Sequence, residues 1–113
     1  MAVVGELIIV AAGVLVTVIG RLTATGRIGR NNFAGIRSKR SMADDESWTI
    51  VHRGAQPWML AGGVMIILSG VIAAAVPAET ASAIIVGVGV ALVMVCTVLG
   101  TLAGHRALSN RPR

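Results

Sequence analysis

Two arginines in the most polar part of this chain could bind an anion. The guanidinium groups of Arg37 and Arg53 can each form paired hydrogen bonds to a carboxylate or a phosphate. Asn31 and His52 can add neutral donors, and Gly35 permits a tight turn that would bring backbone N–H groups toward the same anion. These residue types therefore predict a site for a lipid headgroup or another anionic ligand.

The same segment could instead have a structural role. In that interpretation Asn31, Arg37 and Trp48 lock a loop beneath a helical bundle and bind no ligand. Contact with a partner protein is a third interpretation. In each case we expect the segment's polar and aromatic side chains to converge on one site: Asn31, Arg37, Trp48, His52 and Arg53.

Other kinds of site find little support. His52 and His105 are far apart in sequence and no Cys/His cluster accompanies them, which argues against a metal site. Asp44, Asp45 and Glu46 are consecutive, so on a helix they point in different directions and do not suit paired acid–base catalysis. No nucleophile elbow, P-loop or dinucleotide fingerprint occurs. We therefore predict no enzyme, no catalytic residues and no cofactor.

The rest of the chain is strongly apolar. Of its 113 residues, 55% are hydrophobic and 13% are charged, and the mean hydropathy is +0.82, whereas soluble domains carry about 25% charged residues. Three apolar runs approach or reach the length needed to cross a bilayer. We predict an all-α integral membrane three-helix bundle, one domain over residues 1–113. Its membrane helices lie at about 3–21, 57–76 and 81–104, with a loop at 22–56 and a tail at 105–113.

The predicted loop contains a start signal for a short amphipathic helix. Ser41 is placed as an N-cap, and Asp44 follows three residues later as the acid of a capping box. Helical spacing puts Trp48 and His52 on one face. We expect this helix to lie along the inner membrane surface and to turn at Pro57 into the second membrane helix.

Positive charge is confined to one side of the predicted bundle. All ten Lys and Arg residues lie within residues 21–56 or 105–113. The positive-inside rule then places the loop and the C-terminus in the cytoplasm and the N-terminus outside. The net charge of +5 is explained by anionic headgroups of membrane lipids, and nucleic acid is not predicted as a partner.

The third apolar run carries small residues at helical spacing. Gly100 and Gly104 form a GxxxG pair, and Cys96, the only cysteine, lies one step earlier. Gly87 and Ala91 belong to a second ladder. Because small residues let helix backbones approach closely, both ladders predict packing within the bundle or a seam between two copies in a homo-oligomer.

Charged residues avoid the predicted membrane interior. No Asp, Glu, Lys, Arg or His falls at mid-membrane depth, which argues against a proton relay or an ion-coupled transport path. Glu6 and Glu79 would lie near the outer interface, where solvated carboxylates are expected.

The stretch "NNFAGIRSKRSMADDESWTIVHR" resembles the signature of the SdpI family of small bacterial integral membrane proteins, an immunity-protein family. The resemblance falls on Asn31, Gly35, Ile36, Arg37, Ser38, Trp48, His52 and Arg53 and covers about a quarter of the chain. The namesake protects a toxin-producing bacterium from its own secreted factor and also takes part in sensing it. The namesake is longer, with additional membrane helices before the signature.

The resemblance implies a multi-pass protein of the bacterial inner membrane that acts in envelope protection, toxin immunity or signalling through its cytoplasmic loop. Two alternatives remain open from the residues alone. One is a small accessory subunit that packs against a larger membrane-protein partner through the third helix. The other is a binder or carrier of an anionic lipid or phosphate ligand.

Overall fold

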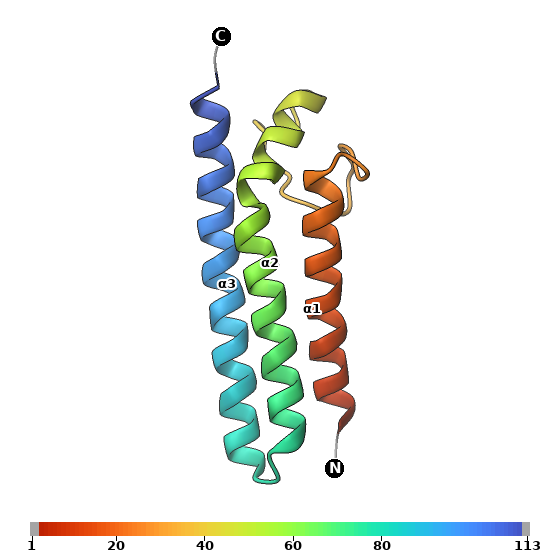
Figure 1. Ribbon diagram of the computed structural model, residues 1–113, viewed down its shortest axis with the longest axis vertical. Helices are drawn as coiled ribbons and strands as arrows, with labels where there is room; N and C mark the ends of the chain where they lie inside the picture. Colours follow the sequence, from red (N-terminus) through yellow and green to blue (C-terminus); the bar gives the residue numbers. More distant parts are fainter. Residues whose placement is uncertain (1–2, 112–113) are drawn as a thin grey trace.

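The computed structural model describes residues 3–111, which form three helices joined by a loop and a short turn (Figure 1). The helices are α1 (Val3–Ala24), α2 (Asp45–Ala75) and α3 (Glu79–Ser109). Helix α2 lies between α1 and α3 and runs antiparallel to both. Residues 25–44 and the end of α3 lie at one end of the bundle, called the loop end. The start of α1 and the turn at residues 76–78 lie at the other, called the turn end.

All three helices are long and apolar enough to cross a membrane by length and composition. Large aliphatic side chains on their outer faces are exposed, for example Leu7 at 62%, Leu68 at 53% and Leu102 at 62%. Such extensive apolar exposure is unfavourable in water and suits lipid. The prediction of three helices that are long and apolar enough to span a membrane is therefore confirmed.

The prediction of a separate amphipathic helix is wrong. Helix α2 is continuous from Asp45 to Ala75, with Pro57 inside it. Its buried positions keep helical spacing across Pro57, from Val51 and Ala55 to Gly62 and Ile66. Because one packed face runs through the proline, contacts with the neighbouring helices offset the backbone hydrogen bond that Pro57 cannot donate.

The N-cap of α2 also differs from the prediction. The cap is Asp44, whose Oδ1 accepts the backbone N–H of Ser47 at 2.6 Å. This bond holds the pKa of the Asp44 carboxyl below its usual value. Ser41, the predicted cap, lies outside the helix and is fully buried. Asp44, which was predicted as the acid of a capping box, is itself the cap, and the helix begins three residues later than expected.

We expect Asp44→Ala to lower the melting temperature of the detergent-solubilised protein by a few degrees, because it removes the cap. Asp44→Asn is the matched control and should stay close to the wild type, since asparagine caps as well as aspartate. The folded-state pKa of Asp44 is lowered, so its contribution is present above the ordinary value of 3.8 and is lost as pH falls through the folded value. Equal melting of the two variants at neutral pH would contradict this role.

Small residues bring α2 and α3 close together. A Cβ atom built on Gly104 would collide with the carbonyl oxygen of Val51, and one built on Gly100 would lie 3.0 Å from Trp58 Cβ. Cys96 is buried in the same interface. The structure thus places this ladder within the bundle.

The second predicted ladder is elsewhere. Gly87 and Ala91 are exposed, and a Cβ on Gly87 would meet nothing within 4 Å. Contact of this ladder with a second copy stays a prediction. Two further close approaches were not predicted: Gly63 of α2 packs against Gly13 of α1, and Gly89 of α3 packs against Ser69.

Candidate functional site

The loop of residues 25–44 lies against the indole and imidazole rings of α2. Gly35 has a φ of +104°, and a Cβ there would lie 2.8 Å from both Trp48 Cη2 and His52 Nε2. Only glycine combines this backbone conformation with so close an approach. The rings of Trp48 and His52 are themselves in contact, with centroids 4.1 Å apart.

The His52 side chain holds the loop by a hydrogen bond to the loop's backbone. The side chain is fully buried, and its Nε2 accepts the N–H of Ile36 at 2.8 Å. Its Nδ1 lies 2.7 Å from the carbonyl oxygen of Trp48. An amide N–H can only donate and a carbonyl can only accept, so the two contacts are both satisfied by a neutral ring with its proton on Nδ1.

His105 holds the same loop from α3. Its Nε2 lies 2.6 Å from Ser38 Oγ, and its Nδ1 lies 2.7 Å from the carbonyl oxygen of Thr101. The carbonyl requires a proton on Nδ1, and in a neutral ring Nε2 then accepts the serine hydroxyl. The two histidines therefore use the same arrangement on two different helices.

Two serines complete the attachment. The backbone N–H of Ser38 donates to Ser41 Oγ (2.9 Å), and the N–H of Ser41 donates to Ser38 Oγ (3.0 Å). The Ser41 hydroxyl also contacts the carbonyl oxygen of Ile36 at 2.7 Å. This reciprocal pairing at a spacing of three is the capping-box pattern, and here it closes a single turn of the loop. We name the set the loop lock; its members are Gly35, Ile36, Ser38, Ser41, Trp48, His52 and His105.

Trp48 anchors the beginning of the loop. Its indole N–H donates to the carbonyl oxygen of Ile28 at 2.9 Å, and the side chain is only 1% exposed. Burial of an aromatic ring of this size is a large contribution to loop stability, and its one polar group is satisfied.

Asn31 shapes the loop locally. Its Oδ1 accepts the N–H groups of Phe33 and Ala34, and its Nδ2 donates to the carbonyl oxygens of Gly29 and Ala34. All four contacts lie within residues 29–34. The amide is fully used by this turn, so in this conformation it has no donor left for a ligand.

The two signature arginines do not join the loop lock. Arg37 is exposed and donates to the carbonyl oxygen of Asn32 at 2.7 Å. Arg53 is exposed too, and within residues 3–111 it makes no hydrogen bond to the other signature residues. The expected convergence therefore includes Trp48 and His52 and leaves out both guanidinium groups. Burying either guanidinium group would have required a paired carboxylate or other acceptors.

A polar pocket of about 580 Å³ at the loop end was not predicted. Arg40 reaches Ser109 Oγ at 2.7 Å, and Arg111 lies 3.8 Å from Glu46 and 3.4 Å from Ser47 Oγ. The pocket lies beside the first turn of α2, whose N–H groups favour negative charge. No group of three or more His, Cys, Asp or Glu residues that could hold a metal ion occurs within residues 3–111.

A model of the SdpI/YfhL protein family matches residues 27–100, which is more than half of the chain. The chain belongs to this family. The match contains the entire predicted signature, all of α2 and most of α3, whereas α1 and His105 lie outside it. Searches of curated proteins and of solved structures each gave no match. Family membership and the three apolar helices together identify a membrane protein of the SdpI/YfhL type.

In this SdpI/YfhL-family chain, sequence reasoning found Gly35, Trp48 and His52 but missed His105. Ser38 and His105 are 67 positions apart, and nothing local to either residue links them. One signal was available: His105 follows Gly104, which packs on α2, and lies four residues after Thr101. A polar residue at the end of a packed helical face is well placed to reach a neighbouring loop.

Proposed function

We propose that this protein acts in envelope protection, as an immunity or signalling protein, and that its loop is the responding element. The observation that carries the proposal is the attachment of one loop to two helices, through His52 on α2 and His105 on α3. The proposed role needs no catalytic step. We further propose that the loop end faces the cytoplasm of the bacterial inner membrane, as the arginine distribution predicts.

The loop lock can report how α2 and α3 lie relative to each other. His52 of α2 and His105 of α3 bind Ile36 and Ser38, which are only two positions apart in the chain. A slide of α3 along α2 by one helical turn, about 5.4 Å, would exceed what such a short segment can follow. One of the two bonds would then break and release part of the loop. A displacement of the helices within the membrane would in this way change the conformation of the loop at the loop end.

Survival of a sensitive bacterium tests this proposal. We expect the wild-type protein to raise survival when the cells meet membrane-active peptides secreted by the strain that carries the gene. His105→Ala should reduce protection to the level of the empty vector at equal membrane abundance, because the loop then loses the Ser38–His105 contact and keeps, within residues 3–111, only the exposed Arg40–Ser109 hydrogen bond to α3. Arg53→Ala, an exposed neighbour of His52, is the control and should protect fully.

A second candidate function is binding of an anionic lipid or phosphate group in the loop-end pocket. Arg40, Arg111 and the first turn of α2 support it. The survival experiment separates the two candidates. Protection that persists in His105→Ala would contradict the loop mechanism and favour this alternative.

A further inference from the structure

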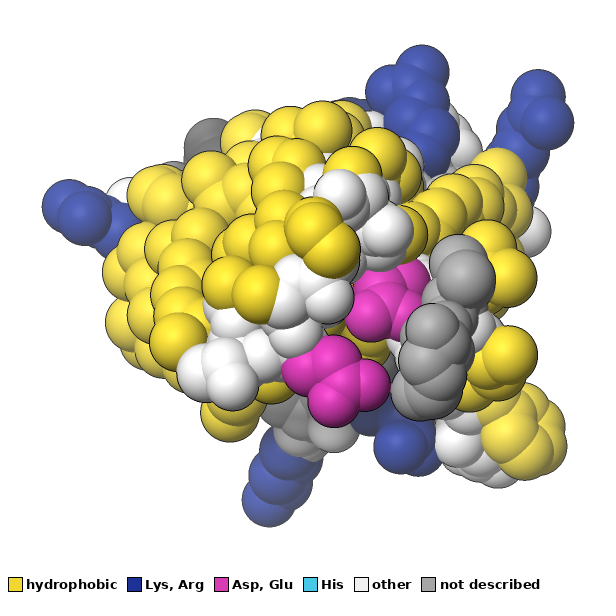
Figure 2. All heavy atoms as spheres, turned by 90° about the horizontal axis from the view of Figure 1, so that it is seen from below, with side chains coloured by type: hydrophobic (Ala, Val, Ile, Leu, Met, Phe, Trp, Pro, Cys, Tyr) yellow, Lys and Arg dark blue, Asp and Glu magenta, His cyan; other side chains and the backbone are white. Residues whose placement is uncertain are grey.

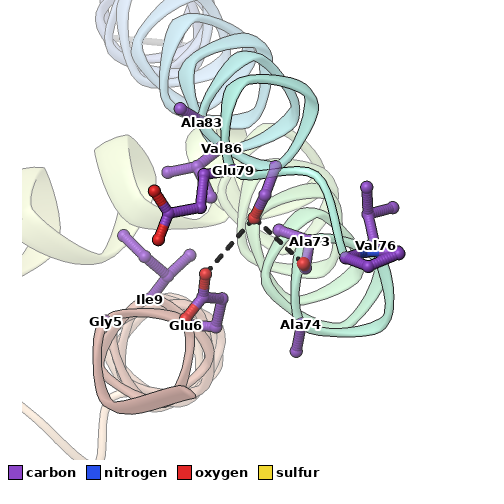
Figure 3. A pocket seen from close by; sticks show the side chains of 11 residues that line it. Gly5, Glu6, Ile9, Ala73, Ala74, Val76, Glu79, Ala83 and Val86 are labelled. Carbon is purple, nitrogen blue, oxygen red and sulfur yellow. Dashed lines mark hydrogen bonds between the residues drawn. The ribbon is translucent and has the colours of Figure 1, made fainter. Parts of the chain in front are cut away.

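The turn end of the bundle contains a cavity that the loop lock does not involve. Its volume is about 640 Å³, and it lies between α1, α3 and the last turns of α2 (Figure 3). Its lining includes Glu6, Ile9, Ala73, Glu79, Ser82 and Val86. Seen from the turn end, acidic side chains gather in the middle of a mostly apolar face (Figure 2).

Among residues 3–111, the Glu6 carboxylate finds fewer hydrogen-bond donors than a carboxylate requires. Its Oε2 is buried and has no partner among the described residues. Its Oε1 lies 3.3 Å from Ser82 Oγ, but the same hydroxyl lies 2.9 Å from the carbonyl oxygen of Ala73. One hydroxyl proton cannot serve both acceptors fully, and the shorter contact is to Ala73. Glu6 was expected to be a solvated surface acid, yet its side chain is partly buried and one of its carboxylate oxygens, Oε2, is buried without a partner among the described residues.

A second acid faces the same space. Glu79, in the first turn of α3, is exposed and lines the same cavity as Glu6 (Figure 3). No Lys or Arg is among the lining residues. Within residues 3–111 the cavity therefore offers negative charge and acceptors without matching donors, and the complementary ligand is a cation that carries N–H groups.

The walls and the size of the cavity indicate an organic cation. Ile9, Ala73 and Val86 supply apolar contact beside the carboxylates. A Ca²⁺ ion needs six to eight oxygen ligands, and two carboxylates, a hydroxyl and a carbonyl supply six only if both carboxylates bind through both of their oxygens. A volume of about 640 Å³ also exceeds what a single ion fills.

We propose that this cavity binds the ammonium group of an amphiphilic molecule. The ammonium N–H groups donate to Glu6 Oε2, Glu79 adds a second negative charge, and the apolar part of the ligand packs on Ile9 and Val86. The binding supplies the donors that the Glu6 carboxylate lacks. This site lies at the opposite end of the bundle from the loop lock and does not depend on the proposed function.

Octylammonium is a suitable probe, with octanol as its uncharged counterpart. The protein, labelled with ¹⁵N in zwitterionic lipid nanodiscs, should show saturable shifts of the Gly5 and Ser82 amide signals with octylammonium and not with octanol. Glu6→Gln should weaken binding at least tenfold. Glu79→Gln should weaken it severalfold, and this residue is exposed, so its replacement leaves folding intact. Glu46→Gln, an exposed acid at the loop end, should bind as the wild type does.

Three results would overturn the site. Shifts that do not saturate, or that octanol reproduces, would show simple partition into lipid. Unchanged affinity in both Glu6→Gln and Glu79→Gln would show that the carboxylates do not bind the ligand. Saturable shifts with Mg²⁺ or Ca²⁺ that exclude octylammonium would assign the cavity to a metal ion instead.

Discussion

Gly104→Ile should lower the free energy of unfolding by about 3 kcal/mol, at the upper end of the usual range for overpacked interfaces. A side chain at this position meets the backbone carbonyl oxygen of Val51, which cannot move aside as a side chain could. The position also faces Gly54: a Cβ built on Gly54 would lie 2.9 Å from Gly104 Cα. The two helices would have to separate, and His105 would move away from Ser38.

Gly87→Ile is the matched control for this substitution. It places the same side chain on α3 at an exposed site with nothing within 4 Å, so we expect a change of less than about 0.5 kcal/mol. Unfolding in mixed detergent micelles measures both variants. Equal stability of the two would mean that α3 does not pack on α2 through Gly104.

His52→Phe should cost about 2 kcal/mol, because it keeps a buried ring and removes the only acceptor for the Ile36 N–H. The backbone amide of Ile36 cannot rotate to find another partner as a hydroxyl can. We therefore expect its hydrogen exchange to accelerate by roughly tenfold or more, alongside the loss of stability.

Arg53→Ala provides the comparison for His52→Phe. Arg53 is the next residue in α2 and is exposed, so its replacement should leave the Ile36 exchange rate unchanged. If His52→Phe also leaves that rate unchanged, the loop is not held by the imidazole.

The three long helices could be predicted from the sequence, because a long run of apolar residues is itself the signal of a helix that crosses a membrane. The beginning of α2 could not. Ser41 was predicted as the cap and Asp44 as the acid of its capping box, whereas Asp44 is the cap. The packing of Val51 and Ala55 against α3 shows that the segment before Pro57 belongs to the same helix. Capping residues show where a helix can begin, whereas the packing of its buried face against neighbouring helices determines where it begins.

The candidate site could also be predicted only in part. Trp48 and His52 are four residues apart on one helical face, so their proximity follows from helix geometry. The positions of Arg37 and Arg53 depend instead on the cost of burying a charge, and both remain exposed. The contact between Ser38 and His105 depends on tertiary packing alone.

The environment of Glu6 at the turn end could not be predicted either, because it depends on tertiary packing. Glu6 is solvated if α1 stands alone, and it becomes partly buried because Ser82 of α3 and Ala73 of α2 come next to it. Pairwise helix packing of this kind has no signature in the residues flanking Glu6.

The protonation of the His52 ring tests the loop lock most directly. In ¹⁵N-labelled protein at neutral pH, we predict a neutral imidazole with its proton on Nδ1. We also predict a scalar coupling between His52 Nε2 and the amide nitrogen of Ile36, transmitted through their hydrogen bond. A proton on Nε2, in either the other tautomer or the charged ring, would contradict the account, because Nε2 could then no longer accept the N–H that holds the loop.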